Sequence, residues 1–182
     1  MKRQKGFTLA ELMVVSAIVA ILLGIAIPSY KYISTSYRMS AEVNGLLGDL
    51  QYARGEALKE GNGVTACVST NGLACTGGSN WNAGWIVFSD PNSNAVVDLG
   101  ERVLKVQGAF TGVVTPDAFN ASGGVTSVTF NREGFATTVN GFVSTTLTLT
   151  EPTNNNQYTR CLQITAVGMM TTLTRTFNPA TC

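Results

Sequence analysis

The sequence predicts an α+β fold, in which one long N-terminal α-helix packs on an antiparallel β-sheet. The first observation is an apolar segment from Phe7 to Ile27, followed by an amphipathic segment that ends near Glu60. The second is the pattern of residues 61–182, where short runs rich in Val, Thr, Ile and Phe alternate with Gly, Asn, Pro and Ser. A helical region followed by a strand-rich region favours the α+β class.

Length and composition limit the classes of protein. The 182 residues suit one domain with an appended segment, and 45% hydrophobic with 13% charged residues argues against a disordered or nucleic-acid-coating chain. The formal charge of +1 includes Lys2, Arg3 and Lys5, which precede Phe7. Without the first six residues, nine basic and eleven acidic residues give a net charge of −2. This charge predicts no strong attraction to nucleic acid. The chain has no histidine, so His-based catalysis and His metal sites are excluded.

The apolar segment is long enough to span a membrane. Between Phe7 and Ile27 the only ionisable residue is Glu11, and a helix of this length measures about 30 Å, the thickness of the hydrocarbon core. The preceding basic residues should stay cytoplasmic, which places the rest of the chain outside. A secretory signal peptide is the alternative, since Gly24-Ile25-Ala26 resembles a cleavage site, but its apolar core usually has about 7–15 residues and no acid.

The helix is expected to continue from Thr8 to Glu60 and to kink at Pro28, which lacks an N–H and leaves the carbonyl of Gly24 without its helical partner. Beyond the kink, apolar and polar residues separate onto two faces at helical spacing. The apolar face comprises Val43, Leu46, Leu47, Leu50, Ala53, Ala57 and Leu58, and the polar face Glu42, Asp49, Gln51, Arg54, Glu56 and Lys59. Gly61-Asn62-Gly63 is the expected stop, because glycine commonly follows the last helical turn.

Seven strands are expected in the remainder of the chain. Their predicted ranges are Val64–Ser69, Gly84–Ser89, Arg102–Val106, Val125–Phe130, Ser144–Thr150, Arg160–Ala166 and Thr171–Phe177. Trp81 and Trp85 precede or open the second strand and are interpreted as anchors of the sheet core.

Four cysteines lie on the outer side of the predicted membrane, where an even number indicates two disulfides. Three pairings can be drawn, and we favour Cys67–Cys75 with Cys161–Cys182, because these close a local loop and tie down the C-terminal end. A tetrathiolate metal site is the alternative, although no Cys-x-x-Cys spacing is present.

The stretch Gly6-Phe7-Thr8-Leu9-Ala10-Glu11-Leu12, preceded by a short basic leader, resembles the leader junction of type IV pilins and of the pseudopilins of type II secretion. In that family a membrane-bound aspartyl peptidase cuts after the glycine and N-methylates the new terminal residue. The resemblance implies cleavage between Gly6 and Phe7, with Phe7 as the methylated N-terminus. It also implies a pilin fold with a loosened helix near Pro28. The family usually has Ile or Val at the position of Ala10.

The family resemblance gives Glu11 a role in assembly. A carboxylate in lipid is unfavourable, by up to about 2.5–3.5 kcal/mol at a helix centre and by less near its end. When subunits stack with an axial stagger, Glu11 of one can approach the amine of Phe7 in its neighbour. At about 4 Å and a dielectric near 20 such a pair attracts by about 4 kcal/mol before desolvation. An acid that merely faces the lipid headgroups is the alternative.

Three further segments narrow the subfamily. Leu50–Lys59, the Trp81–Phe88 segment with its Trp-x-x-Gly-Trp pattern, and the acidic turn from Asp90 to Glu101 resemble the GspH/FimT group of minor pilins and pseudopilins. The turn has oxygen-bearing side chains at the positions of a calcium-binding loop, but Ala95 replaces the glycine of that loop, and Asx turns in a hairpin connection explain the same residues. A calcium site is the alternative to this hairpin connection.

The expected organisation is a leader (1–6), an assembly helix that spans the membrane (7–27), an amphipathic helical half (28–60) and a β-rich soluble domain (61–182). The resemblance implies a structural subunit of a type IV pilus or of a type II secretion pseudopilus, near the tip or at the start of assembly. Its partners would be other pilins, the prepilin peptidase and the inner membrane, with the soluble domain in the periplasm before assembly.

Two other functions are less consistent with the sequence. DNA capture by a minor pilin is the first, but the family's Gly-Arg-x-Arg run is replaced by Gly168-Met169-Met170-Thr171, and only Arg160 and Arg175 are basic after Glu133, so DNA is an unlikely partner. An enzyme is the second, and without histidine no familiar catalytic constellation can be built. We therefore predict no catalytic residues, no metal site and no cofactor.

Overall fold

The computed structural model describes residues 6–110, 118–121, 124–137, 144–151, 155–175 and 182. The chain divides into two compact units, residues 1–38 and residues 39–182. One helix, α1 (Leu9–Glu60), contributes to both units and begins one residue later than predicted. Position 28 lies inside α1, and the kink predicted there stays a prediction.

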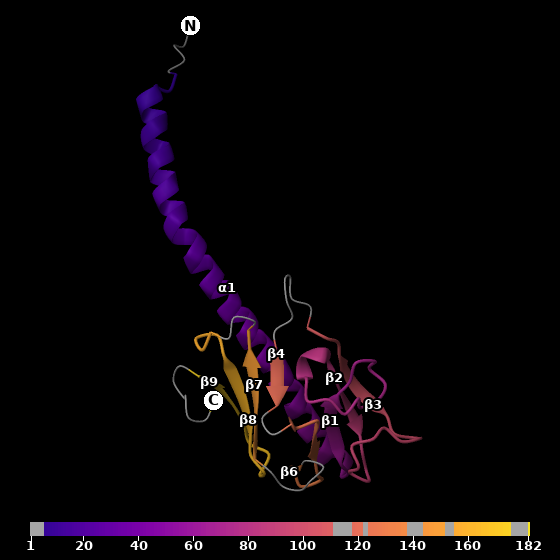
Figure 1. The fold of residues 1–182 in the computed structure, drawn as a ribbon. Helices are drawn as coiled ribbons and strands as arrows, with labels where there is room; N and C mark the ends of the chain where they lie inside the picture. Colours follow the sequence, from indigo (N-terminus) through magenta and orange to yellow (C-terminus); the bar gives the residue numbers. More distant parts are fainter. Residues whose placement is uncertain (1–5, 111–117, 122–123, 138–143, 152–154, 176–181) are drawn as a thin grey trace. The chain divides into compact units, whose positions relative to one another are not determined.

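The second unit contains all the strands that the structure describes, in two sheets. The elements after α1 are β1 (Val64–Val68), the 3-10 turn η1 (Trp81–Ala83), β2 (Trp85–Ser89), β3 (Val103–Gln107), β4 (Ala118–Ala121), β5 (Ser127–Phe130), β6 (Ala136–Thr137), β7 (Thr145–Thr150), β8 (Arg160–Ile164) and β9 (Met170–Thr174). One sheet has the order β3-β2-β1-β5-β6 and the other β4-β7-β8-β9, and every neighbouring pair is antiparallel (Figure 1).

The α+β class is confirmed, but the strand predictions need three corrections. All seven predicted strands are present with ends shifted by a few residues, and the part predicted from residue 176 to Phe177 lies outside the described residues. The strands β4 and β6 were missed, because the first is an Ala-Phe-Asn-Ala segment without a β-branched residue and the second has only two residues. The strands also form two sheets instead of the one that was predicted. The number of sheets depends on which distant strands pair with each other, and local sequence patterns do not show this.

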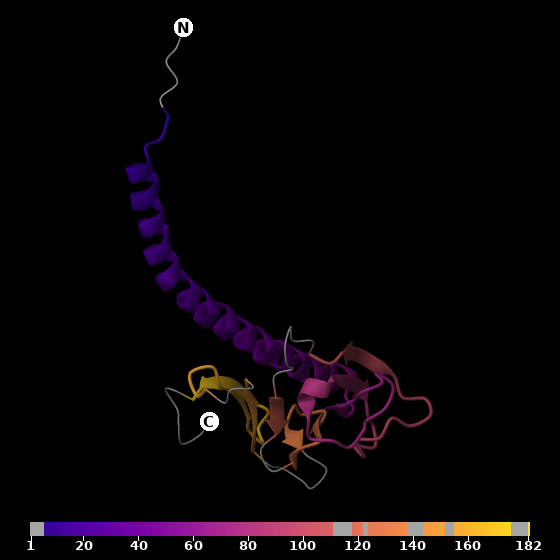
Figure 2. The same ribbon diagram turned by 45° about the horizontal axis from the view of Figure 1, so that its top comes forward.

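Within the second unit, α1 buries one apolar stripe. Met39, Val43, Leu46, Leu50, Ala53 and Ala57 are at most 1% exposed and recur at steps of three and four residues. They share one hydrophobic core with residues of both sheets, among them Val64 of β1, Val87 of β2, and Leu147 and Leu162 of the second sheet. Figures 1 and 2 show this part of α1 passing along both sheets. The stripe therefore joins two sheets that share no strand.

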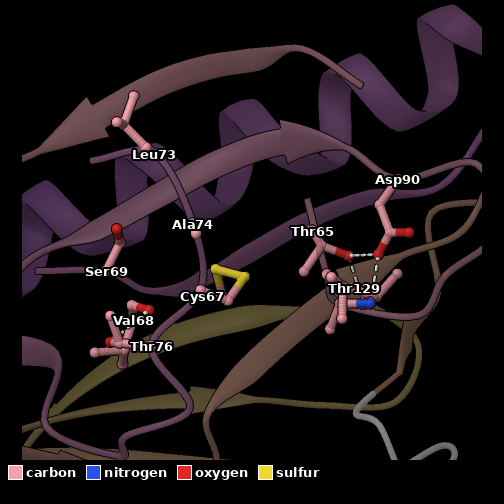
Figure 3. Close-up of a disulfide and its surroundings, with 12 residues drawn as sticks. Thr65, Cys67, Val68, Ser69, Leu73, Ala74, Thr76, Asp90 and Thr129 are labelled. Atoms are coloured by element: carbon pink, nitrogen blue, oxygen red, sulfur yellow. Dashed lines mark hydrogen bonds between the residues drawn. A yellow bond between two sulfur atoms is a disulfide. The ribbon is translucent and has the colours of Figure 1, made fainter. Parts of the chain in front are cut away.

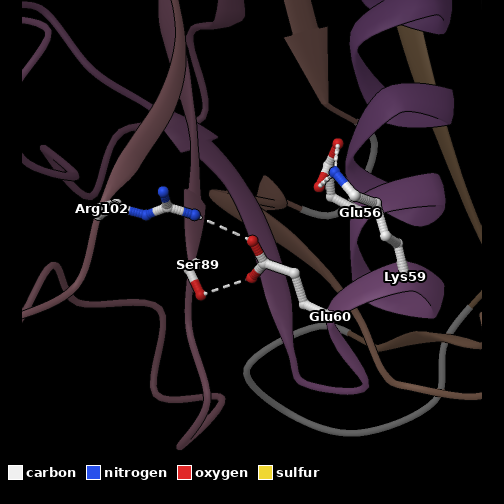
Figure 4. Close-up of polar contacts among 5 residues, drawn as sticks. All are labelled: Glu56, Lys59, Glu60, Ser89 and Arg102. Carbon is white, nitrogen blue, oxygen red and sulfur yellow. Dashed lines mark hydrogen bonds and ion pairs between the residues drawn. The ribbon is translucent and has the colours of Figure 1, made fainter.

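The boundary at the C-terminal end of α1 follows from its sequence. Gly61 adopts a φ of +69°, in the left-handed region that favours glycine, and its N–H donates to the carbonyl of Ala57 at 3.0 Å. The helix is further fixed by its last residue, because Glu60 accepts hydrogen bonds from Arg102 at 3.1 Å and from Ser89 Oγ at 3.1 Å (Figure 4). The predicted stop after Glu60 is confirmed.

Strand β1 is buried on both of its faces. It lies between β2 and β5 in the first sheet, and none of its five side chains is exposed. Val64, Ala66 and Val68 face the core with α1, whereas Cys67 belongs to a smaller cluster with Ile86, Phe88 and the partly buried Cys75, Val97 and Val103. The loops before β2 and β3 thus form a cover over the outer face of this sheet.

Strand β7 of the second sheet has the alternation of a half-buried strand. Its sequence Thr-Thr-Leu-Thr-Leu-Thr places Thr145, Leu147 and Leu149 in buried positions and the intervening threonines in half-buried ones. Successive side chains in a strand point to opposite faces, so both leucines reach the same core. The pairing of Leu147 with Leu162 of β8 continues this core across the sheet.

We expect Leu50→Ala to lower the free energy of unfolding by about 2–5 kcal/mol, because Leu50 is fully buried in the core that joins α1 to both sheets. Leu73→Ala is the matched control: Leu73 is 72% exposed, so its truncation should change stability by less than about 0.5 kcal/mol. Urea unfolding of the detergent-solubilised full chain measures both values. Equal effects of the two substitutions would contradict this account of the core.

Candidate functional site

The N-terminal segment presents an apolar helix that begins with a cap. The Thr8 hydroxyl accepts a hydrogen bond from the Glu11 N–H at 3.3 Å, and the Thr8 carbonyl accepts one from the Leu12 N–H at 3.2 Å. Thr at the cap with Glu three residues later is the sequence signature of a capping box. Glu11 lies in the first turn, where the helix dipole favours a negative charge.

The side chains of this segment are exposed in the isolated chain. Phe7, Leu9 and Ile25 are 77%, 76% and 68% exposed, and the most apolar 18-residue window of α1 has a mean hydropathy of 2.6 with none of it buried. By length and composition this helix can cross a membrane. A surface of this kind needs lipid or other helices around it, so the first unit is built for insertion or for association.

The structure keeps Gly6, Phe7 and Glu11 within the same short segment, immediately before α1 and in its first turn. Their predicted roles in cleavage, methylation and assembly concern a peptidase and neighbouring subunits, so those roles stay predictions.

The cysteines form two disulfides, Cys67–Cys75 and Cys161–Cys182, which are the pairs favoured from the sequence. The first joins the outer face of β1 to the loop that follows it (Figure 3). The second joins β8 to the last residue of the chain. Because a cross-link restricts the unfolded chain, each disulfide favours the folded loop or terminus that it closes.

The turn between β2 and β3 is organised by Asp90, which is fully buried. Its carboxylate accepts a hydrogen bond from Thr65 Oγ1 at 2.6 Å (Figure 3). It also accepts hydrogen bonds from the Asn94 N–H at 3.1 Å and from the Ala95 N–H at 3.0 Å. Ser93 and Ala95 adopt positive φ values of 56° and 57°, which are uncommon for residues other than glycine. The buried carboxylate holds the turn in this conformation.

A second carboxylate of the turn, that of Asp98, also accepts hydrogen bonds from the protein itself. Asp98 accepts hydrogen bonds from the side-chain amides of Asn92 at 2.9 Å and Asn94 at 2.8 Å, and these amides hold the pKa of its carboxyl below the ordinary value. Over the described residues, no group of three or more His, Cys, Asp or Glu side chains is placed to hold a metal ion. The geometry is that of Asx turns in a hairpin connection.

Two residues of α1 do not lie where the helical pattern put them. Asp49 was assigned to the polar face but is only 4% exposed; its carboxylate accepts hydrogen bonds from Trp85 Nε1 at 2.9 Å and from Lys105 Nζ. Leu58 was assigned to the apolar face but is 52% exposed. The only sequence signal for the burial of Asp49 is the indole N–H of a tryptophan, which needs a hydrogen-bond partner when it is buried.

Trp81 and Trp85 are buried and contact each other, with ring centroids 6.4 Å apart. Trp81 Nε1 donates to the carbonyl of Val125 at 3.1 Å, so both indole N–H groups are satisfied inside the unit. The two tryptophans are therefore part of the core.

Arg160, one of the two basic residues considered for DNA contact, is 8% exposed. Its guanidinium donates to Ser40 Oγ at 3.2 Å and to the carbonyl of Gln157 at 3.0 Å. These contacts are made inside the second unit, which leaves little of this cation for a phosphate backbone.

Comparisons with known proteins agree with the fold and with the N-terminal segment. A family model described as type II transport protein GspH matches residues 42–168, and one described as the prokaryotic N-terminal methylation motif matches residues 1–27. The crystal structure of the type IV minor pilin FimU of Pseudomonas aeruginosa covers 77% of this chain and 90% of its own, with a TM-score of 0.50 and 19% identity, which shows a shared fold.

Two curated relatives are similar in sequence. Fimbrial protein Q of Moraxella bovis is 38% identical over 119 residues, which are 58% of this chain and 74% of that protein. Type II secretion system protein H of Pseudomonas aeruginosa is 40% identical over 58 residues, which are 32% of this chain and 34% of that protein. The chain thus spans about a third of the second relative.

We expect the Asp98 carboxyl to titrate below the ordinary range of an aspartate, because the Asn92 and Asn94 amides stabilise its ionised form. The lowered pKa means that this stabilisation is complete above the ordinary value and is lost as the pH falls through the lowered one. Asn92→Ala should move the pKa back toward the ordinary value, while Asn62→Ala outside the turn should not. Carboxyl-carbon NMR of the full chain measures this, and an unchanged pKa in Asn92→Ala would contradict it.

Proposed function

Because the chain belongs to the GspH family, as a minor pilin or pseudopilin of a type IV pilus or type II secretion system, we propose that prepilin peptidase cuts it after Gly6 and methylates Phe7, and that α1 then joins it to a filament. Its role is that of a structural subunit. The observation that carries this proposal is the exposed apolar start of α1, which matches the N-terminal methylation motif and contains one carboxylate.

The carboxylate of Glu11 supports assembly by a physical argument. Cleavage creates an amine at Phe7, and methylation leaves that amine basic. We propose that within a single subunit in the membrane the carboxylate is not paired with this amine, and an unpaired charge is unfavourable in a medium of low dielectric. An axial stagger between neighbouring helices brings the two charges together, so association removes a penalty that the isolated subunit carries.

The proposed location is the inner membrane, with one spanning helix and the soluble unit in the periplasm, followed by the filament. Lys2, Arg3 and Lys5 precede the apolar segment and favour a cytoplasmic N-terminus. Cys67–Cys75 and Cys161–Cys182 fit an oxidising compartment on the other side.

A place near the tip of the filament, where the subunit helps to start assembly, rests on the resemblance to the GspH/FimT group of minor subunits alone. Deletion of the chain distinguishes the two assemblies: loss of twitching indicates a pilus, and loss of exoprotein secretion indicates a pseudopilus. DNA binding is not part of the proposal, because Arg160 already bonds within the second unit.

We expect the mature chain to begin at Phe7 and to carry one N-methyl group. Mass spectrometry of the membrane-extracted protein measures the N-terminal peptide directly. Gly6→Val should block the cut, because a side chain then occupies the position next to the scissile bond, and the basic leader should remain attached. A mature chain that begins at another residue would exclude the proposed processing.

We expect Glu11→Ala to lower the share of the protein found in filaments by about tenfold, which corresponds to a net loss of about 1.4 kcal/mol. Glu11→Asp, which keeps the charge, should lose less. Membrane and filament fractions are compared by immunoblot, with an intact Phe7 terminus as the control for processing. Incorporation of Glu11→Ala at the wild-type level would rule out the proposed charge pair.

A further inference from the structure

The turn between β2 and β3 carries an apolar side chain at its tip. Leu99 is fully exposed and Val96 is 53% exposed, although both belong to a turn that the buried Asp90 organises. The tip itself is closed by two hydrogen bonds, from the Asp98 N–H to Glu101 Oε2 at 2.9 Å and from the Glu101 N–H to the Asp98 carbonyl at 3.1 Å. Leu99 is therefore presented on a preorganised support, which lowers the entropic cost of binding.

Acidic side chains flank this leucine. Asp98 and Glu101 stand on either side of the tip, and in the part of the chain that the structure describes neither forms an ion pair with a cation. The hydrogen bonds from Asn92 and Asn94 lower the pKa of the Asp98 carboxyl and so favour its charged form. We define the knob as Asp98, Leu99 and Glu101: an apolar side chain between two negative charges.

A groove of the second unit has the complementary character. It has a volume of about 470 Å³ and lies between the end of α1 and the turn that joins β8 to β9. Its rim carries the exposed apolar side chains of Leu58 and Met169, which are 52% and 62% exposed. The groove is open at Gly55: no atom lies within 4 Å of the position that a Cβ atom on Gly55 would take. The lining residues are Gln51, Arg54, Gly55, Leu58, Gly168, Met169 and Met170.

Arg54 provides a positive charge in this groove. Its guanidinium donates from Nε to the carbonyl of Gly134 at 3.0 Å and from Nη2 to the carbonyl of Val167 at 3.4 Å. Both acceptors are neutral, and among the described residues no carboxylate forms an ion pair with Arg54. Gly168 is required beside it, since a Cβ there would lie 2.9 Å from Arg54 Nε and 2.1 Å from the Gly134 carbonyl oxygen. The groove thus combines a fixed cation with apolar walls.

We propose that the knob of one copy of this chain docks into the groove of a second copy, with Leu99 against Leu58 and Met169, and with Asp98 and Glu101 facing Arg54. The methionines suit this contact, because their flexible side chains adapt to an inserted group. The knob and the groove belong to different segments of the same unit, so the contact is heterologous, with the knob of one copy against the groove of the other. The inference extends the proposed function, on which it rests, by naming a contact between soluble units in the filament.

The test uses the full-length chain in its own membrane, with two differently tagged copies in the same cells. One copy carries Leu99→Cys and the other Met169→Cys; both positions are exposed, and the four native cysteines are already paired. A short thiol cross-linker should join the two tags at about ten times the yield of the matched pair Leu73→Cys with Met169→Cys, because a docked pair has a high effective concentration.

Charge and specificity are tested on the same pair. Glu101→Lys in the Leu99→Cys copy should lower the cross-linked yield several-fold, because it places a cation against Arg54. A yield equal to that of the Leu73→Cys control would overturn the proposal, and so would cross-linking of Leu99→Cys to another pilin with no product between the two tags. The Phe7 terminus and the filament content of the same cells are measured in parallel. Normal values with no cross-link reject the docking contact alone, whereas an unprocessed chain absent from filaments rejects the proposed function.

Discussion

Burial of the apolar stripe of α1 against two separate sheets is the interaction on which the second unit depends. The stripe from Met39 to Ala57 meets the inner face of each sheet, so the same six side chains hold both sheets in one core. Each buried leucine in such a core contributes about 1.5–3 kcal/mol through removal of apolar surface from water. The two sheets share no strand, and the helix is what makes their side chains into one core.

Polar contacts and a disulfide then fix the position of β2 and β3 against α1 and hold the loops that cover the first sheet. Asp49, buried within the helix, accepts hydrogen bonds from Trp85 of β2 and Lys105 of β3 and so sets their position against α1. On the outer face of the same sheet, the Cys67–Cys75 disulfide and the Asp90 carboxylate each hold one covering loop. A buried carboxylate is tolerated when its oxygens are satisfied, and here each of them has a donor.

The two units divide the work of a filament subunit. The first 38 residues contain an apolar helix with a single acid, a surface that suits lipid before assembly and other helices after it. The described surface of the second unit includes the knob at Leu99 and the groove around Arg54. If the proposed docking contact forms, anchoring by α1 and recognition between copies reside in different parts of the chain.

By itself the sequence determined the features that depend on local chemistry. Helical spacing located α1 and its glycine stop, alternation located strands such as β7, and the resemblance of residues 6–12 pointed to the family, since each of these signals lies within a short segment. Tertiary structure alone decided the division into two sheets, the short strand β6, the burial of Asp49 and the groove around Arg54. The burial of Asp49 depends on Trp85, 36 residues further along the chain, and the position of Arg54 depends on Gly134, 80 residues further along. Local periodicity carries no information about contacts over such separations.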